Sequence, residues 1–250
     1  MFNLLGFILC APNPSPSADP SLVPLSPPQT PIPRPPSPIP RLIAADPVLA
    51  SILAEVEQRL DGDAAHDLGH LFRVADWTVR LSGDIEPRTS IAAALLHDVV
   101  NVPKNHADRG VASERSADVA REVLPPLGFD AATTELIAQA IVDHSFSRGA
   151  VPRSDLGRAL QDADRLEALG VIGTFRCIAT GVRFGAHFFD AADPWAVNRP
   201  LDDKRFSIDH FFTKLLKLPE TFQTAEGRAE ANRRVAIMHA LLAALAAELA

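Results

Sequence analysis

The distribution of proline is the feature that most restricts how this chain of 250 residues can fold. Thirteen of its 22 prolines lie in residues 11–40, and between Pro31 and Pro40 almost every second residue is proline. Proline lacks a backbone N–H and fixes its φ angle, so such a stretch suits neither a helix interior nor a central strand. We therefore expect residues 1–45 to be a disordered, extended, proline-rich tail and residues 46–250 to form the folded domain.

Helical periodicity starts at Asp46-Pro47, where an N-cap residue precedes a proline suited to the first helical position. Apolar residues then recur at helical spacing in segment after segment, and alternating strand patterns are absent from the sequence. The first predicted helix ends before Gly62, and the others cover about 66–82, 88–100, 111–124, 131–144, 154–169, 206–217 and 226–249. The fold class predicted for residues 46–250 is all-α, a single helical bundle domain.

Composition narrows the classes of partner. The net charge is −7 with histidine neutral, which argues against nucleic-acid polymers because polyanion binding needs a basic face. Small phosphorylated ligands remain compatible if a metal or a few local cations hold their phosphates. No run of about 18 uncharged apolar residues occurs, so no membrane span is expected. The two cysteines, Cys10 and Cys177, are far apart and predict no disulfide framework, which fits a cytoplasmic location.

One segment departs from an ordinary amphipathic pattern. Residues 90–100 are apolar almost all round except for His97-Asp98, and such a helix is expected to be buried. Burying an ionised carboxylate costs several kcal/mol unless it is paired or binds a metal. His97 and Asp98 can also hydrogen-bond each other or a neighbouring backbone group. Taken alone, the pair favours this structural role over a metal site.

Two further segments favour a metal site. His66 and His70 are four residues apart and would share one face of a helix, although both could instead face water at a polar helix start. Asp162, Asp164 and Arg165 lie in a segment whose packed side is marked by leucines, and a solvated Asp162/Arg165 face is the structural alternative. The order His, His-Asp, Asp on three helices offers nitrogen and oxygen ligands, which suit Mn²⁺, Fe²⁺, Co²⁺, Ni²⁺ or Zn²⁺ and suit Mg²⁺ less.

The order His70, His97-Asp98, Asp164 resembles that of the HD-domain superfamily of metal-dependent phosphohydrolases, and most closely its YedJ-like branch. The resemblance covers roughly residues 48–249. The matching phrases are AHDLGHLFRVA, ALLHDVVNVPKNHADR, HSFSRG, LQDADRLEALGVIG and DDKRFSIDHFFTKLLKLPETFQTAEGRAEANRR. It implies an HD-type helical domain that binds one divalent metal ion, with Mn or Mg as activator and Fe, Co, Ni or Zn as further candidates. The implied substrate is a nucleotide or another small phosphate ester or anhydride.

The resemblance also implies roles for individual residues. Metal ligation falls to His70, His97, Asp98 and Asp164, with His70 preferred to His66 because it precedes Leu71-Phe72-Arg73-Val74 in the register of the motif. Catalytic roles fall to Asp98, Lys104 and His144. The substrate-binding candidates are Lys104, His106 and His144. Arg73, Arg165 and Arg176 are weaker ones, because an arginine here can simply pair with a ligand carboxylate. Apart from the resemblance, we expect His66 to bind substrate or to act as an outer partner of a ligand.

Two departures from the family pattern leave alternatives open. Asn101 stands where several HD hydrolases have an acidic residue, and it cannot titrate, so His144 or a water on the metal must be considered as the general acid. A Glu expected just before the QDADRL phrase is missing or shifted, since Asp155-Leu156-Gly157 occupies that neighbourhood. The alternatives are a catalytically silent scaffold that binds a nucleotide, an HD-type di-iron oxygenase, and a purely structural helical partner protein.

Overall fold

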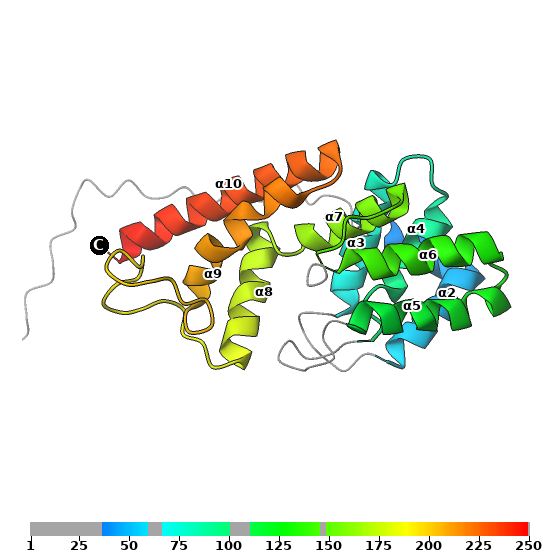
Figure 1. The fold of residues 1–250 in the computed structure, drawn as a ribbon, viewed down its shortest axis with the longest axis horizontal. Helices are drawn as coiled ribbons and strands as arrows, with labels where there is room; N and C mark the ends of the chain where they lie inside the picture. The colour runs from blue at the N-terminus through cyan, green and yellow to red at the C-terminus, as the bar shows by residue number, and fades with distance from the viewer. Residues whose placement is uncertain (1–36, 60–66, 101–110, 146–148, 250) are drawn as a thin grey trace, which may run out of the picture. The chain divides into compact units, whose positions relative to one another are not determined.

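The structure is a computed structural model that describes residues 37–59, 67–100, 111–145 and 149–249. These residues form α-helices and short 3-10 helices, and no strand is present within the described ranges, so the predicted all-α class is confirmed (Figure 1). In chain order the elements are α1 (Ile39–Ala45), α2 (Pro47–Glu57), α3 (Leu68–Leu81), α4 (Pro87–Leu96), α5 (Ala112–Val123), η2 (Pro125–Leu127), α6 (Ala131–His144), α7 (Asp155–Leu166), α8 (Gly170–Arg183), α9 (Ser207–Thr213), η4 (Leu215–Thr221) and α10 (Ala225–Glu248).

Side-chain caps fix the beginnings of the helices that matter for the site. Asp67 caps α3, and its Oδ1 accepts a hydrogen bond of 2.8 Å from the backbone N–H of His70. Ser154 caps α7 and accepts from the N–H of Gly157. Each cap satisfies a backbone donor that would otherwise lack a partner at the first turn, and so fixes where the helix starts.

The predicted tail ends earlier than residue 45. Residues 39–45 form α1, in which Ile39 and Ile43 are buried at 1 % and 2 % exposure. Asp46 caps the following helix as predicted, with Oδ1 2.9 Å from the N–H of Val48. The boundary was misplaced because the density of prolines up to Pro40 hid a short amphipathic helix with Pro40 in its first turn. Residues 1–36 lie outside the described residues.

The segment after α7 forms a helix that the sequence analysis did not predict. Gly170 has φ +71°, and α8 starts at this residue directly after the turn that follows α7. Three glycines and several β-branched residues give α8 a low intrinsic helix propensity. It packs against α9 and α10, so tertiary contacts override that propensity. Gly173 permits the close approach of α8 to the turn that precedes it, because a Cβ there would lie 2.2 Å from the carbonyl carbon of Ala168.

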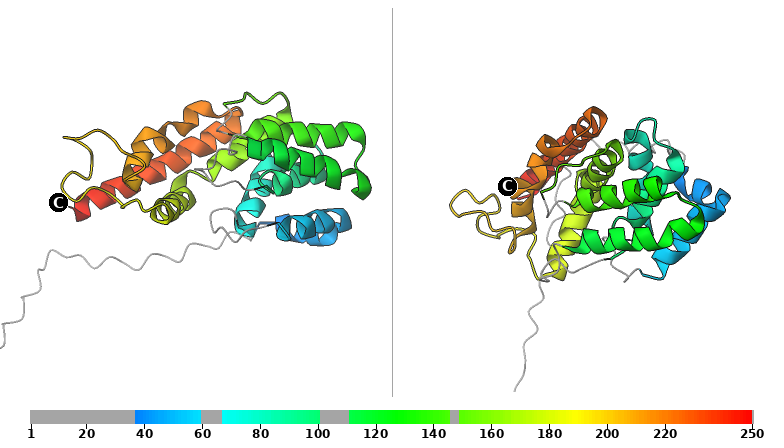
Figure 2. Two further views of the ribbon diagram at one scale, coloured as in Figure 1. Left: turned by 60° about the horizontal axis from the view of Figure 1, so that its bottom comes forward. Right: turned by 45° about the vertical axis from the view of Figure 1, so that its right-hand side comes forward.

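Two hydrophobic clusters form the core, and α7 contributes to both. The larger cluster draws on α1 to α7 and contains Leu156, Leu160 and Ala163 of α7. The smaller one packs Leu166 against apolar residues of α9, η4 and α10. Figures 1 and 2 show α7 between the blue-to-green helices and the group formed by α8, α9 and α10. The C-terminal end of α7, which carries Asp164, therefore lies where the two clusters meet.

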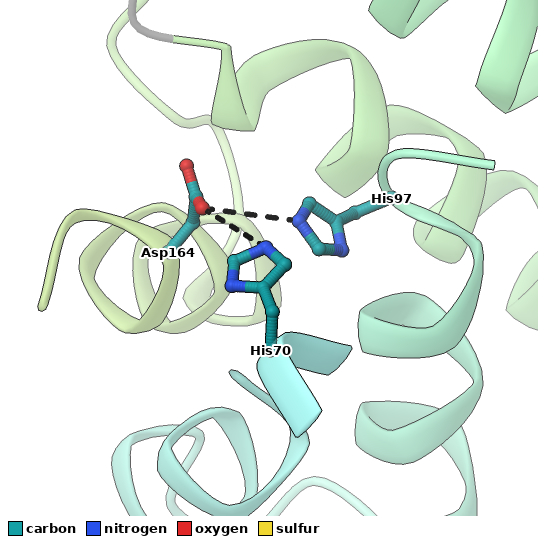
Figure 3. A group of neighbouring side chains, drawn as sticks. All are labelled: His70, His97 and Asp164. Carbon is teal, nitrogen blue, oxygen red and sulfur yellow. Dashed lines mark ion pairs between the residues drawn. The ribbon is translucent and has the colours of Figure 1, made fainter. Parts of the chain in front are cut away.

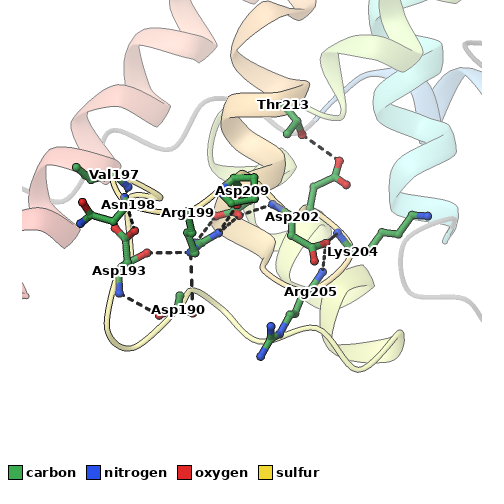
Figure 4. A network of polar contacts seen from close by, with 12 residues as sticks. Asp190, Asp193, Val197, Asn198, Arg199, Asp202, Lys204, Arg205, Asp209 and Thr213 are labelled. Carbon is green, nitrogen blue, oxygen red and sulfur yellow. Dashed lines mark hydrogen bonds and ion pairs between the residues drawn. The ribbon is translucent and has the colours of Figure 1, made fainter.

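A network of ion pairs orders the long connection between α8 and α9 (Figure 4). Asp209 is fully buried, and its Oδ1 accepts a 2.9 Å hydrogen bond from Nη2 of Arg199. Its Oδ2 accepts from the backbone N–H of Asp202 at 2.7 Å. Asp193 accepts from the N–H groups of Val197 and Asn198. These bonds satisfy the polar backbone of a connection without regular secondary structure.

Within the described ranges, no helix combines the length and apolar character that crossing a bilayer would require.

Candidate metal centre

Helix α4 delivers the His-Asp pair to the interior. All residues from Thr89 to Leu96 are buried, and the helix ends at Leu96, so His97 and Asp98 lie in the turn just beyond it. The predicted helix over 88–100 was therefore too long by one turn. His97 is fully buried, and its Nδ1 lies 2.7 Å from the carbonyl oxygen of Ala94. A donated Nδ1–H at that carbonyl leaves a lone pair on Nε2.

His70 and Asp164 face this imidazole from two other helices (Figure 3). Nε2 of His70, on α3, lies 3.7 Å from Oδ1 of Asp164, on α7. Nε2 of His97 lies 3.9 Å from the same carboxylate oxygen. His70 is buried, whereas 27 % of the Asp164 side chain is exposed, so the group opens to solvent on the carboxylate side.

Asp98 and His144 extend the group. Nε2 of His144, at the end of α6, lies 3.5 Å from Oδ1 of Asp98. Oδ2 of Asp98 lies 3.7 Å from Nε2 of His97. His144 is buried, and its Nδ1 lies 2.6 Å from the carbonyl oxygen of Ile141, which leaves Nε2 directed at the carboxylate. The structure thus brings together all four residues predicted as metal ligands and two of the three predicted catalytic residues, Asp98 and His144.

Burial and charge shift the pKa values in this group. Burial lowers the pKa of His97 from its ordinary 6.5 to about 4, although Asp98 opposes that shift, so the ring is neutral at pH 7. Burial also acts to lower the pKa of His144, but the hydrogen bond and charge of Asp98 outweigh it and raise the value. Burial acts to raise the pKa of Asp164, whereas the imidazoles of His97 and His70 hold it below its ordinary value.

The residues present fit a divalent metal ion. Nε2 of His97 is buried and has no hydrogen-bond partner among the described residues, which costs free energy unless a ligand satisfies it. Potential ligand atoms lie within 4.8 Å of one another in two overlapping groups: His70, His97 and Asp164, and His97, Asp98 and His144. Neutral imidazole nitrogens and carboxylate oxygens form a donor set suited to first-row divalent metals.

Asp162 has a structural role. It is fully buried, and its carboxylate accepts hydrogen bonds from the backbone N–H groups of Gln223 at 2.9 Å and Thr224 at 2.7 Å. Burial raises its pKa despite these bonds. The alternative of a solvated Asp162/Arg165 face was therefore wrong for Asp162, whose carboxylate is bound to the residues before α10 while that of Asp164 faces His70.

The arginines predicted as substrate-binding candidates contact other protein groups: Arg73 and Arg176 lie near the carboxylate of Glu167, and Arg165 contacts a backbone carbonyl. Nε and Nη2 of Arg73 both lie 2.8 Å from Oε2 of Glu167, a buried carboxylate that the sequence analysis did not single out. Arg165 is buried and donates from Nη1 to the carbonyl oxygen of Thr221, so this part of its side chain is directed at the end of η4. Arg176 lies 3.9 Å from Glu167.

Two residues of the site region escaped the sequence analysis. Glu167 follows Asp164 by three residues, a spacing that places both on one side of α7 and its terminal turn. Gln161 is fully buried, and its Nε2 donates to the carbonyl oxygens of Asp143 and Ala150. It thereby ties α7 to the residue before His144. The signal for Glu167 was its place among the apolar residues Leu166, Ala168 and Leu169, whereas Gln161 adjoins Asp162 and carried no such signal. His66, Asn101, Lys104 and His106 lie outside the described residues.

Comparisons with known proteins find an HD domain in this chain and proteins with the same fold. A model of the HD domain family matches residues 67–169, a range that contains all four predicted ligands. The chain is 28 % identical over 180 residues to the protein YpgQ of Bacillus subtilis (strain 168), covering 70 % of this chain and 80 % of YpgQ.

Solved structures with the same fold include three from bacilli and lactobacilli. A structure from Lactobacillus plantarum has a TM-score of 0.62 and 28 % identity, covering 80 % of this chain and 96 % of its own. An HD-superfamily hydrolase from Bacillus thuringiensis has a TM-score of 0.59 and 27 % identity over 84 % of this chain and 97 % of its own. The structure of Bacillus subtilis YpgQ in complex with ADP, 23 % identical, has a TM-score of 0.60 over 80 % and 96 % of the two chains and shows likeness of fold.

The matched domain, the ordered ligand set and the shared fold point to one family. Residues 67–169 match the HD domain family.

Proposed function

We propose that this protein is a metal-dependent phosphohydrolase that acts on a nucleotide or another small phosphate ester or anhydride. The observation that carries the proposal is the convergence of His70, His97, Asp98 and Asp164 around one partly exposed point, with the imidazole nitrogen of His97 buried and unsatisfied. When bound, a divalent cation lowers the pKa of a coordinated water and polarises a phosphoryl oxygen.

The protein residues would hold this ion through nitrogen and oxygen. His97 is kept neutral at pH 7 by burial, and its Nδ1 is held by a backbone carbonyl, so Nε2 is available as a ligand without loss of a proton. Asp98 and Asp164 supply negative charge that offsets the charge of a cation. The exposed quarter of each carboxylate, 25 % for Asp98 and 27 % for Asp164, leaves a side through which a substrate can approach.

His144 is suited to move a proton. Its raised pKa keeps a larger fraction of the ring protonated near pH 7, and Nε2 points at Asp98 rather than into a closed apolar pocket. A protonated imidazole in that place can donate to the leaving oxygen of a phosphate ester. This role fills the position of general acid that Asn101 leaves open.

Cations near the ligands are candidates for the phosphate groups of the substrate. Lys104, His106 and His66 are proposed from the motif alone. Among the candidate arginines, Arg73 is more exposed than Arg165 and Arg176: 39 % of its side chain is exposed, although Glu167 already holds its guanidinium. The ADP complex of YpgQ, which has the same fold, supports a nucleotide as the ligand class. YpgQ shares 28 % identity with this chain.

A phosphate-release screen tests the proposal. Purified full-length protein, first stripped with a chelator, would be assayed against nucleoside mono-, di- and triphosphates with Mn²⁺, with Mg²⁺ and without metal. We expect turnover only with added metal, and a reduction in Lys104→Ala that appears mainly as a higher KM. Tight nucleotide binding without turnover would instead support the silent scaffold, and tightly bound iron with an absorption spectrum of a di-iron centre would support the oxygenase.

A further inference from the structure

Glu167 is a fully buried carboxylate directly beside the proposed metal site. It is the C-cap residue of α7, one turn beyond Asp164, and none of its surface is exposed. Burying a charged carboxylate costs several kcal/mol unless ion pairs and hydrogen bonds compensate. The groups that compensate for Glu167 therefore indicate its role.

Its nearest partners link a predicted metal ligand to an arginine. Oε2 of Glu167 lies 3.5 Å from Nδ1 of His70, and 2.8 Å from both Nε and Nη2 of Arg73. Nη1 of Arg176 lies 3.9 Å from the same oxygen, and Nη1 of Arg234 lies 3.9 Å from Oε1. Three guanidinium groups thus surround one carboxylate, whose Oε2 is also directed at the back of the His70 ring.

The two nitrogens of His70 face different carboxylates. Nδ1 faces Glu167, and Nε2 faces Asp164 at 3.7 Å. A histidine ligand to a metal usually donates its second ring N–H to an acceptor, which fixes the tautomer and the orientation of the ring. For His97 and His144 this acceptor is a backbone carbonyl at 2.7 Å and 2.6 Å. At His70 a charged carboxylate occupies the corresponding place.

We propose that Glu167 is the positioning residue for the His70 side of the metal site. Its carboxylate accepts the Nδ1–H of His70 and so directs Nε2, with its lone pair, toward the ion. Arg73 holds the same oxygen, so the chain of contacts runs from Arg73 through Glu167 to His70. The inference rests on the proposed function in that it takes His70 to be a ligand, and it adds a residue that the HD ligand set does not contain.

A purely structural role makes different predictions. If Glu167 only offsets the charges of the arginines, its loss would lower the stability of the fold and leave the His70 tautomer and the intrinsic metal affinity unchanged. If it positions His70, both of these properties would change. The two roles are therefore separated by measurements that do not depend on turnover.

The experiment compares Glu167→Gln and Glu167→Asp with Glu230→Gln as the matched control. Glu230 also pairs with Arg234, at 2.7 Å, and its contacts are to arginines of its own helix. Mn²⁺ affinity of the full chain, stripped of metal, would be measured by calorimetry. Nitrogen-15 NMR of the imidazoles would report the His70 tautomer in the metal-free protein, and thermal unfolding would be followed in parallel.

We expect Glu167→Gln to bind Mn²⁺ roughly 10- to 100-fold more weakly than the wild type and to raise the population of the Nε2–H tautomer of His70. Glu167→Asp should lose less affinity, and Glu230→Gln should match the wild type. Equal Mn²⁺ affinity in Glu167→Gln, even with a lower melting temperature, would overturn the inference and leave the proposed function standing. If Glu167→Gln does not fold, the test falls to Glu167→Asp, and wild-type Mn²⁺ affinity in that variant would also overturn the inference. A wild-type protein that binds no Mn²⁺ would overturn the proposed function itself.

Discussion

Nε2 of His70 and Oδ1 of Asp164 lie 3.7 Å apart, although they belong to α3 and α7. His97 approaches the same oxygen at 3.9 Å from the turn after α4. Asp162, only two residues before Asp164, instead accepts hydrogen bonds from the residues that lead into α10. The direction of each side chain on α7 therefore distinguishes the carboxylate of the site from the carboxylate that joins the helices.

Alanine variants of these carboxylates should separate metal binding from stability. We predict that Asp164→Ala and His70→Ala lose the metal, whereas Asp162→Ala retains it and unfolds more easily. Removal of the Asp162 carboxylate leaves the partly buried backbone donors of Gln223 and Thr224 without this partner, at a cost of up to about 3 kcal/mol for each. Metal content and urea unfolding would be measured on all variants. Loss of metal in Asp162→Ala with retention in Asp164→Ala would contradict the assignment, and His66→Ala should retain most of the metal.

Truncations test the boundary of the folded part. Deletion of residues 1–36 should leave the melting temperature and activity nearly unchanged, as the proline content of that segment predicts. Deletion of residues 1–45 removes α1 and the buried side chains of Ile39 and Ile43. Burial of two such side chains contributes about 3–6 kcal/mol, so the longer deletion should unfold at a clearly lower temperature. Equal melting temperatures of the two truncated proteins would show that α1 contributes nothing to the core.

The pH dependence of stability should carry the signature of His97. In the metal-free protein the unfolded chain protonates this ring below about pH 6.5, whereas the folded chain does so only near pH 4. Because the unfolded state binds the extra proton in this window, His97 lowers stability as the pH falls from 6.5 to 4, by about 3 kcal/mol in total.

The comparison with His97→Asn isolates this effect. His144, whose pKa is raised, contributes in the opposite direction but is present in both proteins. The difference in unfolding free energy between wild type and variant should therefore rise with pH between 4 and 6.5 and then level off. A difference that stays constant across this range would contradict the burial of a neutral His97.

His144 should affect turnover more than metal binding. Four proposed ligands remain in His144→Ala, so metal content should be close to that of the wild type. Loss of a general acid lowers kcat by roughly 10²- to 10⁴-fold. The control is His210→Ala. His210, in α9, also pairs with a carboxylate, that of Asp203 at 3.0 Å in the connection before α9. Steady-state kinetics on the nucleotide substrate would give kcat for both variants. An unchanged kcat in His144→Ala would show that His144 has no catalytic role.

Much of the fold could be predicted because most helices carry both a periodic apolar pattern and a capping residue. Asp46, Asp130 and Ser154 are N-caps of a type that the sequence indicates, because each is a residue favoured at that position and directly precedes a helix. Helix α8 could not be predicted in this way, since Gly170 resembles a helix end and the following residues favour other conformations. Its packing partners come from α9 and α10, far along the chain, and no local pattern reports such contacts.

The ligand set was predicted in two steps: burial makes the His97-Asp98 pair costly without a partner, and the resemblance to the HD-domain superfamily adds His70 and Asp164. The roles of Asp162 and Glu167 could not be, because both depend on tertiary contacts. Asp162 meets the residues before α10, and Glu167 meets Arg73 from α3. In each case the sequence shows a carboxylate near a motif, and only the packing of the helices shows what the carboxylate contacts.

The most direct test of the account is the metal content of Asp98→Ala. Asp98 lies between His97 and His144 and is proposed as both ligand and catalytic residue. Wild-type protein, loaded with Mn²⁺ and desalted, should retain about one ion or more per chain by elemental analysis. The control Asp118→Ala, which removes a carboxylate that is 72 % exposed, should retain the same amount. The account predicts that Asp98→Ala retains well below one ion per chain, and full metal retention in that variant would contradict it.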